Sequence, residues 1–343
     1  MVERAPFHAG TTERTVMRHG AWTRVDNADG PRRATTYYAA DGGVEIGVYR
    51  NDTGVIDTVS FRRGSDAGWD IEARNTGERA TVLGESCALW HQTFKPGRVV
   101  DVANMTRVSC VTDDGIELSY RIEGSFGVLS SVEATRIARR PVATDEVRPP
   151  REVLDVAWWD GREVAAAAAS AGPMPDFEVV MQAVSEIGAG SADRLTRTTR
   201  RHFPWTLVEE TAGETRRKLV VTNAATGLSI EFAREAKGGS ERLLIAKYPP
   251  SLSPLVPSVP RTGADRHADV LGEGCDWFDT SPAIMDAGRG ECRTPDGLVL
   301  MEDAWSRGGY RHLIAVRVSR EPVEAGAVLP PAGVLDPKIW GLD

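Results

Sequence analysis

The chain has 343 residues, which is long enough for two domains of ordinary size, each with its own core. Apolar residues make up 41% and charged residues 26%, as is typical of a globular protein. The net charge of −8 argues against a nucleic-acid partner, since nucleic-acid binding needs a basic surface. No stretch approaches 18 consecutive apolar residues, so no membrane span is expected.

The beginning of the chain predicts its location. Met1–Pro6 lacks the charged, apolar and small-residue regions of a signal peptide. The expected location of the chain as given is therefore the cytoplasm. If a leader has been removed, the expectation changes to the periplasm or the cell exterior.

The strongest feature of the sequence is an internal repeat. The matching blocks are RHGAWTRV (18–25) with RHFPWTLV (201–208), VLGESC (82–87) with VLGEGC (270–275), and CVTDDGIEL (110–118) with CRTPDGLVL (292–300). The copies then stay in step to Trp159 and Trp340, and all offsets lie between 181 and 188 residues. We therefore predict a tandem duplication, with a first repeat over 1–159, a connector over 160–194 and a second repeat over 195–343.

Within each copy the pattern predicts strands. Apolar residues alternate with polar or small ones in VEIGV (44–48) and in LSIEF (228–232), as in a sheet that is covered on one face. Short turn signals such as DGG (41–43) separate the runs and favour hairpins. The expected fold class is mainly β, with two tandem repeat domains that are each a curved antiparallel sheet or half-barrel with little helix. In the connector, Phe177–Val184 has helical spacing and predicts a short helix that stops at 188–190.

The pattern VLGxxC followed by CxTxDG[IL]xL occurs once in each copy and resembles the lipoprotein-carrier fold. It also resembles the small cofactor-free enzyme class of violacein biosynthesis. The resemblance covers the latter half of each copy. It implies a bacterial-type, lipocalin-like curved sheet in each copy, whose concave face can hold an apolar ligand. No motif carries an activity over to this chain.

All four cysteines fall on equivalent positions of the two copies. Cys87 and Cys110 are 23 residues apart, and Cys275 and Cys292 are 17 residues apart. One interpretation is a disulfide in each copy, which would contribute roughly 3 kcal/mol and would imply an oxidising compartment. The alternative is buried thiols. A zinc site is disfavoured, because only His91 adds a third ligand in the first copy and the second copy has no counterpart.

Several polar and aromatic residues are weak candidates for a site. His19 and His202 are equivalent and each precedes a tryptophan by three residues, which predicts opposite faces if both lie on one strand. Asp276 and Asp279 occur only in the second copy and could serve as an acid and a base. The candidate ligand-binding residues are Trp22, Trp205, Trp90 and Trp277. Glu85 and Glu273, each after a glycine, are expected at strand ends.

Two classes of function fit these features. The first is binding of an apolar or aromatic small molecule in a cavity of the duplicated β fold. The second is a cofactor-independent enzyme that acts on an apolar or aromatic metabolite through groups such as His19, His202, Asp276 or Asp279. No nucleotide, zinc-protease or hydrolase motif occurs in a usable context. No cofactor and no metal are predicted, and the sequence does not indicate an oligomeric state.

Overall fold

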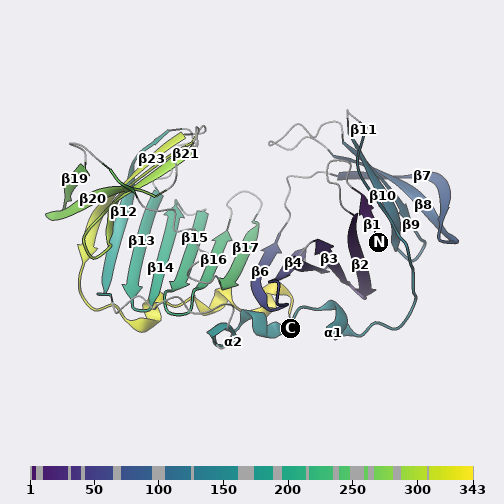
Figure 1. The fold of residues 1–343 in the computed structure, drawn as a ribbon, viewed down its shortest axis with the longest axis horizontal. Coiled ribbons are helices and arrows are strands. Elements are labelled where there is room, and N and C mark those ends of the chain that lie inside the picture. The colour runs from purple at the N-terminus through teal and green to yellow at the C-terminus, as the bar shows by residue number, and fades with distance from the viewer. Residues whose placement is uncertain are drawn as a thin grey trace. The chain divides into compact units, whose positions relative to one another are not determined.

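A computed structural model shows a protein built mainly of antiparallel β-sheet, with little helix (Figure 1). The structure describes residues 2–4, 11–29, 32–39, 43–64, 71–94, 105–124, 127–160, 174–187, 195–213, 216–234, 239–247, 259–261, 266–280, 287–306 and 309–342. Across these ranges, none of the helices has the length and apolar character needed to cross a bilayer.

The chain forms two compact units. Unit 1 comprises Met1–Ile56, Arg63–Pro150 and Leu342, and unit 2 comprises Asp57–Arg62, Arg151–Gly341 and Asp343. Strand β6 (Ile56–Arg63) therefore contributes to unit 2, where it pairs with β17 (Glu241–Lys247). One strand from the first half of the sequence thus belongs to the sheet of the second unit.

In the part of unit 1 that the structure describes, ten antiparallel strands make up the sheet. They are β1 (Val2–Arg4), β2 (Thr11–His19), β3 (Trp22–Asp29), β4 (Arg32–Ala39), β5 (Val44–Arg50), β7 (Ile71–Val82), β8 (Glu85–Phe94), β9 (Thr106–Val111), β10 (Glu117–Gly124) and β11 (Gly127–Glu133). Their spatial order is β5–β4–β3–β2–β1–β11–β10–β9–β8–β7. The first strand thus joins two meanders.

Unit 2 has the remaining strands. Besides β6 and β17 they are β12 (Phe177–Ile187), β13 (Leu195–His202), β14 (Trp205–Ala212), β15 (Arg216–Asn223), β16 (Leu228–Arg234), β18 (Val259–Pro260), β19 (His267–Val270), β20 (Glu273–Asp279), β21 (Ala287–Arg293), β22 (Val299–Ser306) and β23 (Gly309–Ser319). The order is β17–β16–β15–β14–β13–β12–β23–β22–β21–β20, and β18 and β19 both pair with β20.

Alternation of buried and less buried residues explains why these segments are strands. In β16, Leu228, Ile230 and Phe232 are buried and the residues between them are not. The short helix predicted over Phe177–Val184 is wrong, because this segment is part of strand β12. Phe177, Val179 and Met181 are buried on one face of that strand, with the period of two that a strand has. A short apolar run fits both periods, and pairing with β13 and β23 selects the strand. The predicted stop at 188–190 lies outside the described residues.

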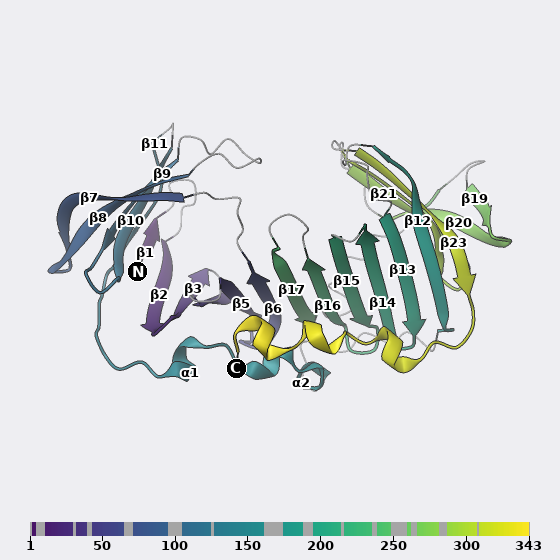
Figure 2. The ribbon, with the colours of Figure 1, turned by 180° about the vertical axis from the view of Figure 1, so that it is seen from behind.

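Helical segments are short and lie at the ends of strands. Unit 1 contains α1 (Thr144–Val147), and unit 2 contains η1 (Arg151–Leu154), α2 (Val156–Asp160), η3 (Ala325–Val328), η4 (Ala332–Val334) and η5 (Pro337–Trp340). Figure 2 shows the segments near the C-terminus running along one end of the row β13–β17. There Trp340 is fully buried and donates its indole N–H to the carbonyl of Val334.

Candidate functional site

The four cysteines form two disulfides, one in each unit. Cys87 on β8 is bonded to Cys110 on β9, and Cys275 on β20 is bonded to Cys292 on β21, with Cα atoms 5.3 Å apart in both pairs. No group of three or more His, Cys, Asp or Glu side chains in the described residues is arranged to hold a metal. The two disulfides suggest an oxidising, extracytoplasmic environment and not the cytoplasm that the N-terminal sequence favours.

An arginine that follows the last strand of each sheet ties two of its hairpins together. In unit 1, Arg139 donates to Glu85 at 2.6 Å and to Asp114 at 3.2 Å. The corresponding residues of unit 2 are Arg320, Glu273 and Asp296. Glu85 and Glu273 stand at the starts of β8 and β20. Their contacts give both residues a structural role, because each carboxylate is used by an arginine of the same sheet.

The contact of Asp296 with Arg320 predicts how the stability of unit 2 depends on pH. The hydrogen bond from Arg320 lowers the pKa of Asp296 below its ordinary value of 3.8, against a smaller opposing effect of burial. A carboxylate with a lowered pKa stabilises the folded state above pH 3.8, and this contribution is lost as the pH falls through the lowered pKa. We expect Asp296→Asn to be less stable than the parent at pH 7 and to lose less further stability in acid. Urea unfolding curves of both proteins, recorded from pH 7 to below pH 3.8, test this expectation. If the free energies of unfolding of the two proteins change in parallel with pH, the expectation is wrong.

A groove of about 690 Å³ lies on strands β8–β11 of unit 1. This volume falls in the range of small-molecule sites. Leu83, Leu89 and Val108 contribute apolar surface, while Arg121 and Glu133 contribute charge. The lining is completed by Cys110, Ser119, Tyr120, Ser131, Val132, Ala134 and Thr135.

Strand register explains why the sheet is hollowed here. Directly paired residues share one face of a sheet. One row across β8–β11 is Leu89, Cys110, Ser119 and Glu133, and the next row is His91, Val108, Arg121 and Ser131. Ser119 and Ser131 are small, so the two central strands leave open space between larger neighbours.

The corresponding face of unit 2 is filled. Taking the disulfide cysteine as the reference point, the matching rows are Trp277, Cys292, Met301 and Ile314, and then Asp279, Gly290, Asp303 and His312. Trp277 and Met301 thus stand where unit 1 has Leu89 and Ser119. The guanidinium of Arg261 lies 4.5 Å from the Trp277 ring and so close above Gly290 that a Cβ atom there would collide with it. Large side chains and this arginine occupy the space that is open in unit 1.

A polar cluster lies on that same face of unit 2. Asp303 accepts a hydrogen bond from the Tyr310 hydroxyl at 2.9 Å and lies 2.5 Å from Nδ1 of His312. Arg261 donates to Asp279 at 2.8 Å and lies 3.6 Å from Asp303. Burial raises the pKa of Tyr310, and the hydrogen bond with Asp303 raises it further. A carboxylate that holds Nδ1 of a histidine orients the ring for acid–base work at Nε2.

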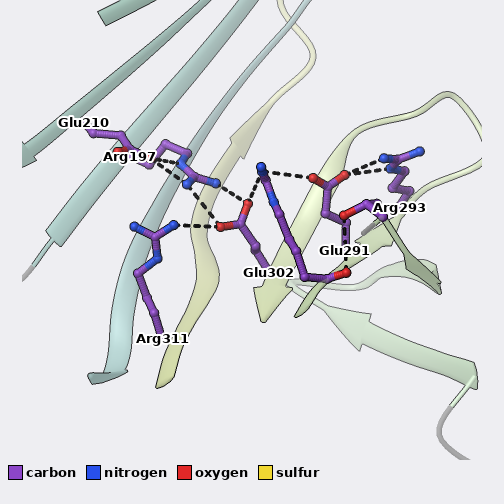
Figure 3. A network of polar contacts seen from close by, with 8 residues as sticks. Arg197, Glu210, Glu291, Arg293, Glu302 and Arg311 are labelled. Carbon is purple, nitrogen blue, oxygen red and sulfur yellow. Dashed lines mark hydrogen bonds and ion pairs between the residues drawn. The ribbon is translucent and has the colours of Figure 1, made fainter. Parts of the chain in front are cut away.

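The opposite face of unit 2 carries a second cluster, the ion network, which is drawn in Figure 3. Its members are Arg197, Glu210, Arg289, Glu291, Arg293, Glu302 and Arg311. Glu302 is 1% exposed and contacts Arg197 at 2.6 Å, Arg289 at 2.5 Å and Arg311 at 3.1 Å. Burial raises the pKa of Glu302, but the hydrogen bond and charge of Arg197 and the charges of Arg289 and Arg311 hold it below its ordinary value. Glu302 is therefore a carboxylate shared by three guanidinium groups.

The ion network spans four neighbouring strands of unit 2. Arg197 lies on β13 and Glu302 on β22, with β12 and β23 between them. Their side chains meet across these two strands, at 2.6 Å. Sequence reasoning missed these residues because no local motif marks them.

The structure separates the other residues that the sequence singled out. His19 and Trp22 are direct cross-strand partners, and so are His202 and Trp205. A two-residue turn separates the members of each pair, so they lie on different strands and the prediction that they point to opposite faces is wrong. His202 lies 2.9 Å from Asp176, whereas His19 is exposed. Asp276 pairs with His267, away from Asp279.

The predicted tryptophans do not gather at one place. Trp22 and Trp277 are buried, while Trp90 and Trp205 are half-buried. None of the four lines the groove of unit 1. Trp22 packs under the guanidinium of Arg148 at 5.5 Å.

Comparison with known proteins does not assign the chain to a family. No protein-family model matches the sequence, and no curated protein is similar to it at a significant level.

Proposed function

We propose that the protein is a tandemly duplicated β fold that binds an apolar or amphipathic small molecule in the groove of unit 1. The observation that carries this proposal is the groove itself, which Ser119 leaves open where Met301 stands in unit 2. An apolar part of the ligand would contact Leu89 and Val108. A polar end would reach Arg121 or Glu133 at the rim.

The duplication is supported by matching detail in the two halves of the sequence. Both sheets follow the same order of strands outward from their first strand, β1 or β12. Leu83 and Leu271 both adopt a positive φ, 55° and 56°, in the turn before the disulfide strand. Trp159 donates to the carbonyl of Val153, as Trp340 does to that of Val334. Residues shared by both copies thus build the scaffold, and a function specific to one copy lies where they differ. With two disulfides, we place the protein in the periplasm or outside the cell.

Filling the groove tests the proposed binding. Ser119→Met introduces the residue that unit 2 has at the matching position, and Ser119→Ala is the control that keeps the space open. The methionine side chain would displace the part of the ligand that contacts the groove there. A loss equal to about two buried CH₂ groups, at ~0.8 kcal/mol each, should weaken binding about tenfold. We expect the uncharged fluorescent probe N-phenyl-1-naphthylamine to bind the parent and Ser119→Ala saturably, and Ser119→Met about tenfold more weakly. Equal binding by all three proteins, or no saturable binding by the parent, would refute the proposal.

A cofactor-independent enzyme is the second candidate, and one observation favours it. Asp303 holds His312 in an orientation that suits proton transfer, next to the half-buried Tyr310. Mass spectrometry of small molecules incubated with the protein distinguishes the candidates. A binding protein returns its ligand unchanged, whereas an enzyme converts it and loses the conversion in His312→Asn.

A further inference from the structure

We propose that the ion network of unit 2 binds an oxyanion, namely the carboxylate or phosphate group of a small molecule. This site lies on the face of unit 2 that carries Glu302 and is independent of the groove in unit 1. The proposal depends on three observations: the charge balance of the network, a buried donor of Arg311 that finds no acceptor, and the different residues on the matching strands that are described in unit 1.

Among the side chains that the structure describes, the network carries more positive than negative charge. Its four arginines, Arg197, Arg289, Arg293 and Arg311, face three glutamates, Glu210, Glu291 and Glu302. Four positive charges less three negative ones leave a formal charge of +1. An anion is the ligand that neutralises such a surplus in a partly buried setting.

The two carboxylate oxygens of Glu302 cannot accept hydrogen bonds from all the N–H groups of the three guanidinium groups around it. Its Oε1 accepts from both Arg197 and Arg311 at 3.1 Å, and its Oε2 accepts from Arg197 and Arg289. Among the described residues, this bond to Glu302 is the one hydrogen bond that Arg311 donates, and its Nε atom is buried without a partner. A buried donor without an acceptor is costly, so it points to an acceptor that a ligand supplies.

The same carboxylate prepares the site for an anion. Guanidinium groups repel one another, and Glu302 holds three of them close together before any ligand arrives. Glu302 and Arg197 form the buried floor, with side chains 1% and 9% exposed, whereas Arg311 is 31% and Arg289 48% exposed. The two outer arginines can therefore be reached from solvent. Their forked donors match the paired oxygens of a carboxylate or phosphate.

Unit 1 does not repeat this arrangement. Tyr120 is the cross-strand partner of Ser109, as Glu302 is of Glu291. Tyr120 thus replaces the central carboxylate. Arg107 on β9 donates to both oxygens of Glu117 and lies over the Tyr120 ring at 4.1 Å. The Nε atom of Arg107 is also buried without a partner, but among the described residues of unit 1 no carboxylate is shared by three guanidinium groups.

Calorimetric titration of the full chain with inorganic phosphate, and separately with acetate, tests the site. We expect at least one of the two anions to bind saturably at low ionic strength, and the stronger one to identify the group. Arg311→Gln should weaken this binding about tenfold, because it removes a charge-assisted contact. Arg317→Gln is the matched control on the same strand, since Arg317 is 64% exposed and pairs with Glu178.

If Arg311→Gln is less stable than the parent, the shift in melting temperature that the anion causes in each protein still tests the proposal. The bound anion should raise the melting temperature of the parent and of Arg317→Gln, and should raise that of Arg311→Gln much less. Binding of N-phenyl-1-naphthylamine should be the same in all three proteins, so failure here is separate from failure of the groove. No saturable binding of either anion by the parent, or equal binding by the parent and Arg311→Gln, would overturn the proposal.

Discussion

Glu302→Ala should destabilise unit 2 by about 3–5 kcal/mol, as removal of one partner from a buried ion pair does. The carboxylate is almost fully buried and neutralises Arg197, whose side chain is 9% exposed. Without it, Glu210 is the one acidic partner left to Arg197 among the described residues, and three guanidinium groups face one another. Urea unfolding followed by circular dichroism measures the loss. Glu302→Gln should show most of it, because the amide keeps the shape and removes the charge.

The matched control for this prediction is an ion pair at the surface of the same unit. Glu231 pairs with Lys218, and both side chains are about 40% exposed. Glu231→Ala should therefore change the free energy of unfolding by less than about 1 kcal/mol. A double-mutant cycle with Arg197→Ala then isolates the coupling between Glu302 and Arg197. A loss from Glu302→Ala no larger than that from Glu231→Ala would show that the network does not stabilise the fold.

The sheets were predictable because their signals are local. Alternation in 44–48 and 228–232 identifies strands directly, and the recurrence of both cysteines of a pair at different spacings suggested that they meet. The error at Phe177–Val184 has the same origin, since a run of eight residues fits a helix as well as a strand. What chose the strand was pairing with β23, whose residues are more than 120 positions away in the sequence.

The candidate sites were mostly not predictable, because distant residues form them. Arg197 and Glu302 are 105 residues apart in the sequence and meet through the pairing of β13, β12, β23 and β22. Asp303 and His312 are cross-strand partners on β22 and β23, and neither stands in a repeated block. Of the sequence candidates, only Asp279 belongs to the polar cluster, through Arg261. The expectation that function lies where the proposed copies differ fits both proposals, since Ser119 and Glu302 each differ from the matching residue.

Trp340→Ala should destabilise unit 2 by about 3–5 kcal/mol, the cost of removing a fully buried aromatic side chain. The Trp340 ring is 0% exposed and lies 5.3 Å from the Phe61 ring, which β6 contributes to this unit. The change also leaves the carbonyl of Val334 without its indole donor. Trp340→Phe should retain most of the packing and lose mainly that hydrogen bond, about 1 kcal/mol.

Lys338→Ala is the control for the loss at Trp340, because Lys338 is exposed in the same short helix, η5, and should change stability by less than about 0.5 kcal/mol. Unfolding is best followed by circular dichroism, because the substitution itself removes a fluorophore. If Trp340→Ala and Lys338→Ala unfold at the same urea concentration, the C-terminal helical segments do not support the sheet. If Trp340→Ala alone unfolds early, the last turn of the chain is part of the core of unit 2, and the strand that carries Phe61 is held there by the Trp340 ring.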